Sequence, residues 1–506
     1  MSSENKHVIG VIGAGAMGRG IIQLFAQAGH EVRFFDASEE AVAAGHEFVA
    51  GMIQRGADKG RMTQEQADSI KNNLIPCPEI SDLSSCDIVV EAIIENIDIK
   101  QKVFAQLEEV VSEKAILSSN TSSLVVAEIA AKCKHPERVA GLHFFNPVPL
   151  MKVAEVISAV KTSSATVATL KSVVEGAGHR AVIAEDQPGF LVNHAGRGLY
   201  TEGLRILEER AADQADVDRV MREAAGFRMG PFELLDLTGL DVSGKVMESI
   251  YEQFQQEPRF RPSSLVAPRV AAGLYGRKTG EGWYRYEDNQ KIDNEEKNIP
   301  TLTAGTQVWI DPQATQVPEL TALATSAGAE IVDNPTGDAL LIIQPWGIDS
   351  TQACADANLD ASRCVAVDPL PGLDKRRTLM LTPITTEAMR DSALAILASD
   401  GTAVTVINDS PGFILQRVLA TIVNIATNIA QRGIASVEDI EDAVKLGLGY
   451  PNGPLSWGDK IGGERILEIL EGMQAVTGDP RYRPSQWLRR RVELNLSLLT
   501  PETNRS

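Results

Sequence analysis

Apolar residues in the first 190 positions gather in short runs of strand length, separated by stretches with helical spacing. The run at 7–12 leads into a glycine-rich turn, and the apolar residues of 20–28 then recur on one helical face. Alternating strands and helices predict a parallel sheet with helices on both faces. Further apolar runs that fit this pattern lie at 31–35, 87–94, 115–118 and 139–145.

From Pro188 onward the pattern is helical, without strand signals, and this helical region occurs twice. The sequence Pro-Gly-Phe-Leu-Val at 188–192 recurs as Pro-Gly-Phe-Ile-Leu at 411–415, an offset of 223 residues. Gly-Pro at 230–231 recurs at 453–454 with the same offset. We infer that a helical domain has been duplicated.

A glycine motif lies between the first strand and the first helix. Gly13, Gly15 and Gly18 form GxGxxG, and the second strand ends at Asp36. Gly13 permits a tight turn, Gly15 lets the backbone approach a pyrophosphate, and Gly18 allows the helix to pack closely on the strand. The carboxylate of Asp36 can accept hydrogen bonds from both ribose hydroxyls and would repel a 2′-phosphate. The motif therefore predicts a Rossmann-type domain that binds NAD rather than NADP.

These patterns predict four domains. An α/β Rossmann-type NAD-binding domain (1–187) is followed by an all-α domain (188–286), a reduced Rossmann-like domain (287–405) and a second copy of the all-α domain (406–506). The third domain has short apolar runs but no glycine motif, so we do not expect it to bind a nucleotide.

Composition narrows the class of protein. The net charge of −20 argues against nucleic acid or an anionic membrane as a partner. No apolar run reaches the roughly 18 residues that a membrane span needs. The five cysteines are scattered without a CxxC pair, which fits reduced thiols better than disulfides. We expect a cytoplasmic protein with no metal site and no membrane partner.

Three further blocks point to the chemistry. They are SNTSS at 119–123, GLHFFNP at 141–147 and PGFLVN at 188–193. His143 lies at the end of an apolar strand run, where a parallel sheet presents its ligands. Oxidation of a secondary alcohol requires a base for the hydroxyl proton, and histidine suits that task because its ordinary pKa lies near neutrality.

Together with GPFELLD at 230–236 and KTGEGWY at 278–284, these blocks resemble the L-3-hydroxyacyl-CoA dehydrogenase family over residues 7–286. The resemblance implies an oxidoreductase of fatty acid β-oxidation type, which converts an (S)-3-hydroxyacyl-CoA and NAD to 3-oxoacyl-CoA and NADH. The second half resembles the longer bacterial members, which look like 3-hydroxybutyryl-CoA or 3-hydroxyadipyl-CoA dehydrogenases of phenylacetate-type, aromatic-acid breakdown.

The resemblance also implies roles for single residues. His143 would be the base, and Glu155 would orient its imidazole and stabilise the charged form. Ser122 would form a hydrogen bond at the reacting oxygen, and Asn193 would bind substrate oxygens from the first helix of the helical domain. The nicotinamide side of NAD would be contacted by Glu95, Lys100, Ser122, Asn146 and Lys278.

A polar, charged helical segment at 39–73 is predicted to project from the sheet. Coenzyme A carries a 3′-phosphate and a diphosphate, and this segment offers Arg55, Lys59, Arg61 and Lys71. Family members bind the coenzyme in this region, so Lys59 is our candidate contact. The competing interpretation is a charged helix that only faces solvent.

The second half departs from the pattern. Gln416 stands opposite Asn193, and a looser match sets Asp368 opposite His143, so we predict one active site per chain. We expect the two helical copies to pack on each other in place of a dimer interface, and further association of whole chains is left open. Two alternative functions also fit the sequence: a dehydrogenase of a free hydroxy acid, and a non-catalytic NAD-binding structural or regulatory protein.

Overall fold

The computed structural model describes residues 6–293, 295–296 and 298–503. It contains two compact units. The first comprises the chain up to His194 together with Arg432–Leu448. The second comprises Ala195–Gln431 and the chain from Gly449 onward. A segment of the second helical copy thus belongs to the first unit.

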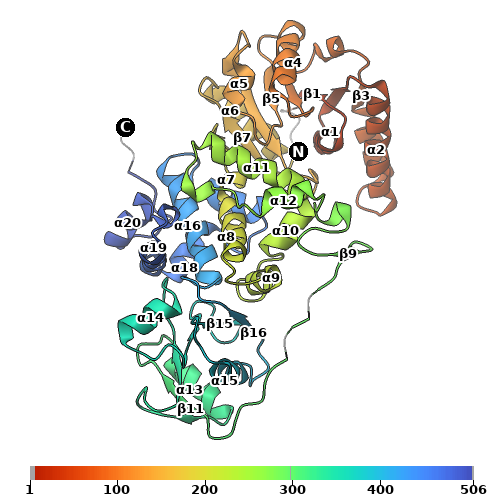
Figure 1. The fold of residues 1–506 in the computed structure, drawn as a ribbon. Helices are drawn as coiled ribbons and strands as arrows, with labels where there is room; N and C mark the ends of the chain where they lie inside the picture. The colour runs from red at the N-terminus through yellow and green to blue at the C-terminus, as the bar shows by residue number, and fades with distance from the viewer. Residues whose placement is uncertain (1–5, 294, 297, 504–506) are drawn as a thin grey trace. The chain divides into compact units, whose positions relative to one another are not determined.

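The first unit is built on an eight-stranded sheet with strand order β3-β2-β1-β4-β5-β6-β7-β8 (Figure 1). All neighbouring strands are parallel except β6 and β7. The short connection at 145–152 explains this exception, because a parallel return needs a crossover of a dozen or more residues. The strands are β1 Val8–Ile12, β2 Glu31–Phe35, β3 Leu74–Pro76, β4 Ile88–Glu91, β5 Ile116–Ser119, β6 Val139–Phe144, β7 Val153–Ser158 and β8 Arg180–Glu185.

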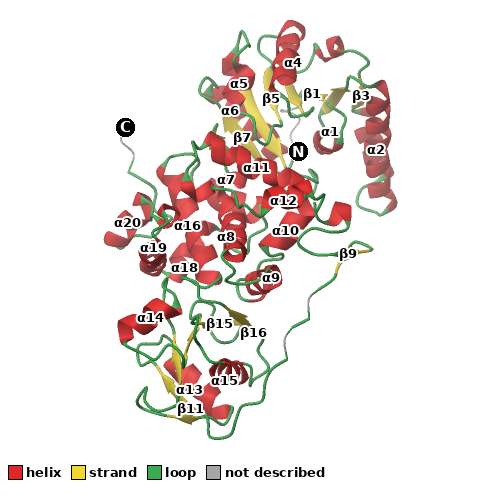
Figure 2. Ribbon diagram, viewed as in Figure 1, coloured by secondary structure: helices red, strands yellow, loops and turns green. Residues whose placement is uncertain are grey.

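Helices cover both faces of this sheet (Figure 2). Successive residues of a strand point to opposite faces, so Val89 belongs to one hydrophobic core and Val90 to the other. The predicted α/β layering is confirmed. The helices are α1 Ala16–Gln27, α2 Glu39–Asp58, α3 Gln64–Asn72, α4 Ile97–Val110, α5 Val126–Ala130, α6 Ser164–Gly176, α7 Val192–Ala195 and α17 Val437–Asp442.

The second unit contains most of both helical copies. Helix α8 of the first copy packs against α16 of the second, and α16 in turn contacts α18, α19 and α20. Between α8 and α16, the buried carboxylate of Glu202 accepts a hydrogen bond from Arg417 at 2.8 Å. The helices are α8 Arg197–Glu208, α9 Gln214–Glu223, α10 Pro231–Thr238, α11 Leu240–Gln253, α12 Val266–Ala271, α16 Leu415–Gln431, α18 Pro454–Ile461, α19 Gly463–Thr477 and α20 Gln486–Glu493.

A six-stranded sheet in the second unit has the order β12-β11-β13-β14-β15-β16. As in the first sheet, one antiparallel pair, β14 and β15, lies one strand from the edge. The sheet is therefore a shortened version of the first, as the reduced Rossmann-like prediction requires. Its elements are β11 Gln307–Ile310, α13 Val317–Ser326, β12 Glu330–Ile331, β13 Leu340–Ile343, α14 Ser350–Ala357, β14 Cys364–Val367, β15 Arg377–Leu381, α15 Glu387–Leu397 and β16 Val404–Ile407, after a small hairpin of β9 Tyr286–Glu287 and β10 Gln290–Lys291.

Candidate active site

The glycine loop between β1 and α1 has the geometry of a dinucleotide cradle. Gly13 has a φ of +100°, and a Cβ on Gly18 would lie 1.7 Å from the Gly13 carbonyl oxygen. No atom lies within 4 Å of the Cβ position of Gly15, so the backbone there is open to a ligand at the N-terminus of α1. Asp36 accepts hydrogen bonds from the N–H groups of Ala14 at 2.8 Å and Ser38 at 3.1 Å. Asp36 therefore also fastens this loop.

His143 and Glu155 face each other across the antiparallel strands β6 and β7. The His143 Nδ1 lies 2.6 Å from the Glu155 Oε2. The other carboxylate oxygen accepts hydrogen bonds from the backbone N–H groups of Leu191 at 2.9 Å and Val192 at 2.8 Å. Because a carboxylate only accepts hydrogen bonds, the proton of a neutral His143 lies on Nδ1. Nε2 is then the nitrogen that can accept a proton from an alcohol.

A second buried network supports the loop that follows β5. The Lys100 Nζ donates to the Glu91 Oε1 at 2.7 Å and lies 3.2 Å from the Glu95 Oε2. Glu95 also accepts hydrogen bonds from the Thr121 hydroxyl at 2.5 Å and the Ser122 N–H at 3.1 Å. Burial alone would raise the pKa of Glu95, but Lys100 and these donors hold it below its usual range. The network fixes the position of Ser122, which is partly exposed.

Sequence reasoning missed two residues of this network. Glu91, the last residue of β4, is fully buried and accepts a hydrogen bond from the Ser119 hydroxyl at 2.6 Å. Asn120 accepts one from the Phe144 N–H at 2.8 Å and so joins the SNTSS block to the HFFNP block. The available signal was their position, because polar residues at the carboxyl ends of adjacent parallel strands meet at one sheet edge.

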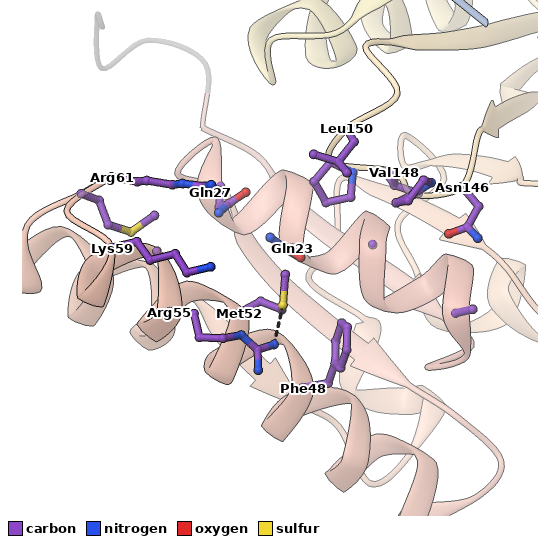
Figure 3. A pocket seen from close by; sticks show the side chains of 16 residues that line it. Gln23, Gln27, Phe48, Met52, Arg55, Lys59, Arg61, Asn146, Val148 and Leu150 are labelled. Carbon is purple, nitrogen blue, oxygen red and sulfur yellow. Dashed lines mark hydrogen bonds between the residues drawn. The ribbon is translucent and has the colours of Figure 1, made fainter. Parts of the chain in front are cut away.

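A cavity of about 580 Å³ opens between α1, α2 and the 146–150 loop (Figure 3). Figure 3 shows Lys59, Arg55 and Arg61 on one side of it, and Asn146 at the other end. Its remaining walls are mainly apolar. They include Ala16, Gly20, Phe48, Met52, Met62, Pro147, Val148, Pro149 and Leu150.

Asn193 directly follows Val192 in α7, and the N–H of Val192 donates to Glu155. Lys278 lies in the second unit, where its Nζ pairs with Asp241 at 2.5 Å. Within the described part of the chain there is no group of three or more His, Cys, Asp or Glu side chains suited to a metal ion. No helix of the described residues has the length and apolar character of a membrane span.

Family models match most of this chain. The model of the 3-hydroxyacyl-CoA dehydrogenase NAD-binding domain matches residues 8–187. The model of the 3-hydroxyacyl-CoA dehydrogenase C-terminal domain matches twice, at 189–286 and 412–499. The chain belongs to the 3-hydroxyacyl-CoA dehydrogenase family. It is thus an NAD-dependent oxidoreductase of 3-hydroxyacyl-CoA thioesters.

Relatives of this dehydrogenase share its full length or its first half. It is 36% identical to the 3-hydroxyadipyl-CoA dehydrogenase of Escherichia coli, over 97% of this chain and 98% of that one. A crystal structure of 3-hydroxybutyryl-CoA dehydrogenase from E. coli superposes with a TM-score of 0.84 at 34% identity, covering 97% of this chain and 99% of that one. The (S)-3-hydroxybutyryl-CoA dehydrogenase of Ralstonia eutropha is 36% identical, with a TM-score of 0.55, and covers 56% of this chain and 100% of its own.

The second half of the dehydrogenase holds different side chains at the matching place. Asp368 follows β14, and its N–H donates to the carbonyl of Thr378 on β15. Its carboxylate accepts a hydrogen bond from the Gln416 amide at 2.9 Å. Burial raises the pKa of Asp368 to about 6. An acid, a threonine and a glutamine thus stand where His143, Glu155 and Asn193 stand in the first half.

Proposed function

We propose that this dehydrogenase oxidises short-chain (S)-3-hydroxyacyl-CoA at a single site in its first half, with His143 as the base. The observation that carries this proposal is the 2.6 Å contact between the His143 Nδ1 and Glu155, which leaves Nε2 for the substrate. His143 Nε2 takes the proton of the 3-hydroxyl while the hydride leaves carbon 3, so a 3-oxoacyl thioester forms. NAD, when bound at the glycine loop, supplies nicotinamide carbon 4 as the hydride acceptor.

Glu155 orients the imidazole in this proposal and stabilises it once it is protonated. Ser122 forms a hydrogen bond at the reacting oxygen, and Asn193 binds substrate oxygens. Glu95 and Asn146 contact the nicotinamide side, and Lys100 acts there through its ion pair with Glu95, which is 3.2 Å long. Lys278 completes the set of proposed cofactor contacts.

The coenzyme of the substrate fits the cationic side of the cavity between α1 and α2. Arg55, Lys59 and Arg61 supply positive charge there in a chain whose net charge is −20. The phosphates of coenzyme A need such charge, and its pantetheine part suits apolar walls. We therefore propose that Lys59 contacts a phosphate of the bound coenzyme.

Two further points belong to the proposal. The packing of α8 against α16 supports the view that the second helical copy takes the place of a partner subunit. The five free cysteines support a cytoplasmic location.

In the decisive test, the enzyme is mixed with NADH and acetoacetyl-CoA, and the absorbance of NADH is followed. His143→Gln is the matched control. We expect rapid oxidation by the wild type and its loss in the variant, with NADH still bound. A wild type that binds NADH but does not oxidise it with any acyl-CoA would refute the proposal. Replacing acetoacetyl-CoA by 3-oxoadipyl-CoA then decides whether a terminal carboxylate on the acyl chain is preferred.

A further inference from the structure

The first unit contains a segment from the far end of the chain. Arg432–Leu448 comes from the second helical copy, yet it packs on the sheet that carries His143 and Glu155. It contains α17 and a π-helical turn at Ala443–Gly447. Such π-helical turns occur frequently at functional sites.

The segment is fastened at both ends of β8. Arg180, the first residue of β8, donates to Asp442 at 2.9 Å and to Asp439 at 2.7 Å. At the other end, the Glu185 N–H donates to the Ile434 carbonyl at 2.8 Å. Arg180 pairs in register with Val153 of β7, so the fastening reaches the strand that carries Glu155.

Gly447, the last residue of the π-helical turn, lies close to two residues near Glu155. A Cβ on Gly447 would lie 3.0 Å from a methyl carbon of Val192 and 3.5 Å from one of Val153. Val192 donates its N–H to Glu155, and Val153 lies two residues before Glu155 on the same strand face. A side chain at position 447 would therefore press on the side chain of Val192, the residue whose N–H holds the carboxylate.

The duplication provides an internal comparison. At the offset of 223 residues, the Asn408 N–H donates to the Ala211 carbonyl, as the Glu185 N–H does to the Ile434 carbonyl. Each helical copy thus caps the last strand of the sheet in the other half of the chain. The counterpart of Gly447 is Ala224, in the copy that caps the second sheet, which has no histidine–glutamate pair. Of these two matching positions, glycine occupies the one that packs on the sheet with the pair.

We propose that Gly447 is a positioning residue for the His143–Glu155 pair, held in place by Arg180 through Asp439 and Asp442. The second helical copy would then serve catalysis in the first half of the chain, although the second half carries no histidine–glutamate pair of its own. The inference rests on the roles proposed above for His143 and Glu155.

The first test compares Gly447→Val with Gly176→Val, a glycine at the end of α6 whose Cβ position has no atom within 4 Å. We expect Gly447→Val to lower kcat about tenfold or more, because displacement of a catalytic pair by a fraction of an ångström is costly. The KM for NADH and the melting temperature stay near those of the control. Adding Val192→Ala, which keeps the backbone N–H, restores most of kcat. A kcat equal to that of the control, or a fall that follows lost NADH binding and is not rescued, overturns the proposal.

If Gly447→Val does not fold, Arg180→Gln and Arg180→Lys decide the question. We expect kcat to fall in Arg180→Gln at an unchanged KM for NADH, and to be partly retained in Arg180→Lys. Wild-type kcat in Arg180→Gln overturns the proposal. A wild type that is inactive on every acyl-CoA instead refutes the proposed function, so the two failures are distinguishable.

Discussion

Replacing Glu155 by glutamine tests the orientation of the catalytic base most directly. The carboxylate is fully buried and accepts two backbone N–H groups at one oxygen and the His143 ring at the other. The amide oxygen of the variant would keep the two backbone hydrogen bonds, since the reverse orientation sacrifices both, at about 1 kcal/mol each or more. The amide NH2 would then face the His143 Nδ1.

An NH2 group at this position can only donate, so the imidazole must accept at Nδ1 and carry its proton on Nε2. That tautomer cannot take the proton of the substrate hydroxyl. In the reverse reaction the imidazolium that donates the proton is destabilised, because its Nδ1–H would face the amide NH2 and not a carboxylate. We expect Glu155→Gln to lower kcat about 10²- to 10⁴-fold, which corresponds to about 3–5 kcal/mol of transition-state free energy. NADH oxidation with saturating acetoacetyl-CoA measures kcat, and NADH fluorescence titration checks that cofactor affinity is retained.

Glu185→Gln is the matched control, because it makes the same chemical change at an exposed position of the neighbouring strand β8. Its kcat should equal that of the wild type. If Glu155→Gln keeps a kcat within about threefold of this control, well short of the usual contribution of a general base, the tautomer argument is wrong.

Three other predictions concern stability and coenzyme binding. Glu202→Gln should lower the free energy of unfolding in urea by about 3–5 kcal/mol, because it leaves the buried Arg417 poorly paired. Glu209→Gln, whose carboxylate is half-exposed, should lower it by less than about 1 kcal/mol, and equal effects would contradict the argument. Since burial raises the folded-state pKa of Asp368 to about 6, the stability from its neutral form is lost as pH rises through that value. The free energy of unfolding of Asp368→Asn minus that of the wild type should therefore increase by about 2–3 kcal/mol between pH 4 and pH 7.5. A difference that does not change with pH would contradict the burial argument. Lys59→Gln should raise the KM for acetoacetyl-CoA about five- to tenfold, as expected for a lost charged hydrogen bond. A change in the KM for NADH alone would instead indicate that the cavity binds NADH and not coenzyme A.

The sequence was sufficient to predict the features that depend on local spacing. Three such patterns can each be recognised within a few residues: the glycines of the nucleotide loop, the strand–helix alternation and the duplicated Pro-Gly-Phe stretch. The α/β fold could be predicted from them. Glu155 shows where such reasoning ends. Its neighbours suggest an ordinary surface acid, and only the antiparallel return of β7 places it opposite His143. The return is encoded in the shortness of the 145–152 connection, which the prediction of an all-parallel sheet overlooked.

Features that depend on tertiary pairing could not be predicted from the sequence. Lys100 looks like a solvent-facing charge on a helix, but it is fully buried between Glu91 and Glu95. The docking of 432–448 on the first sheet is likewise invisible, because helical periodicity says which face of a helix is buried and not which sheet buries it.

The two helical copies have diverged in a way that a pair of identical subunits could not. Glu202 binds Arg417 at 2.8 Å, Arg481 at 3.2 Å and the Tyr482 hydroxyl at 3.0 Å, all in the second copy. At the repeat offset, the position that matches Glu202 is the buried Ile425.

In a symmetric homodimer this charge network would occur twice, and each copy would have to carry both halves of it. Joining the copies in one chain removes that constraint and keeps the partner at a high effective concentration. The first half of the chain could then keep the histidine–glutamate pair, while the second half lost its base and retained the surfaces that hold the first in place.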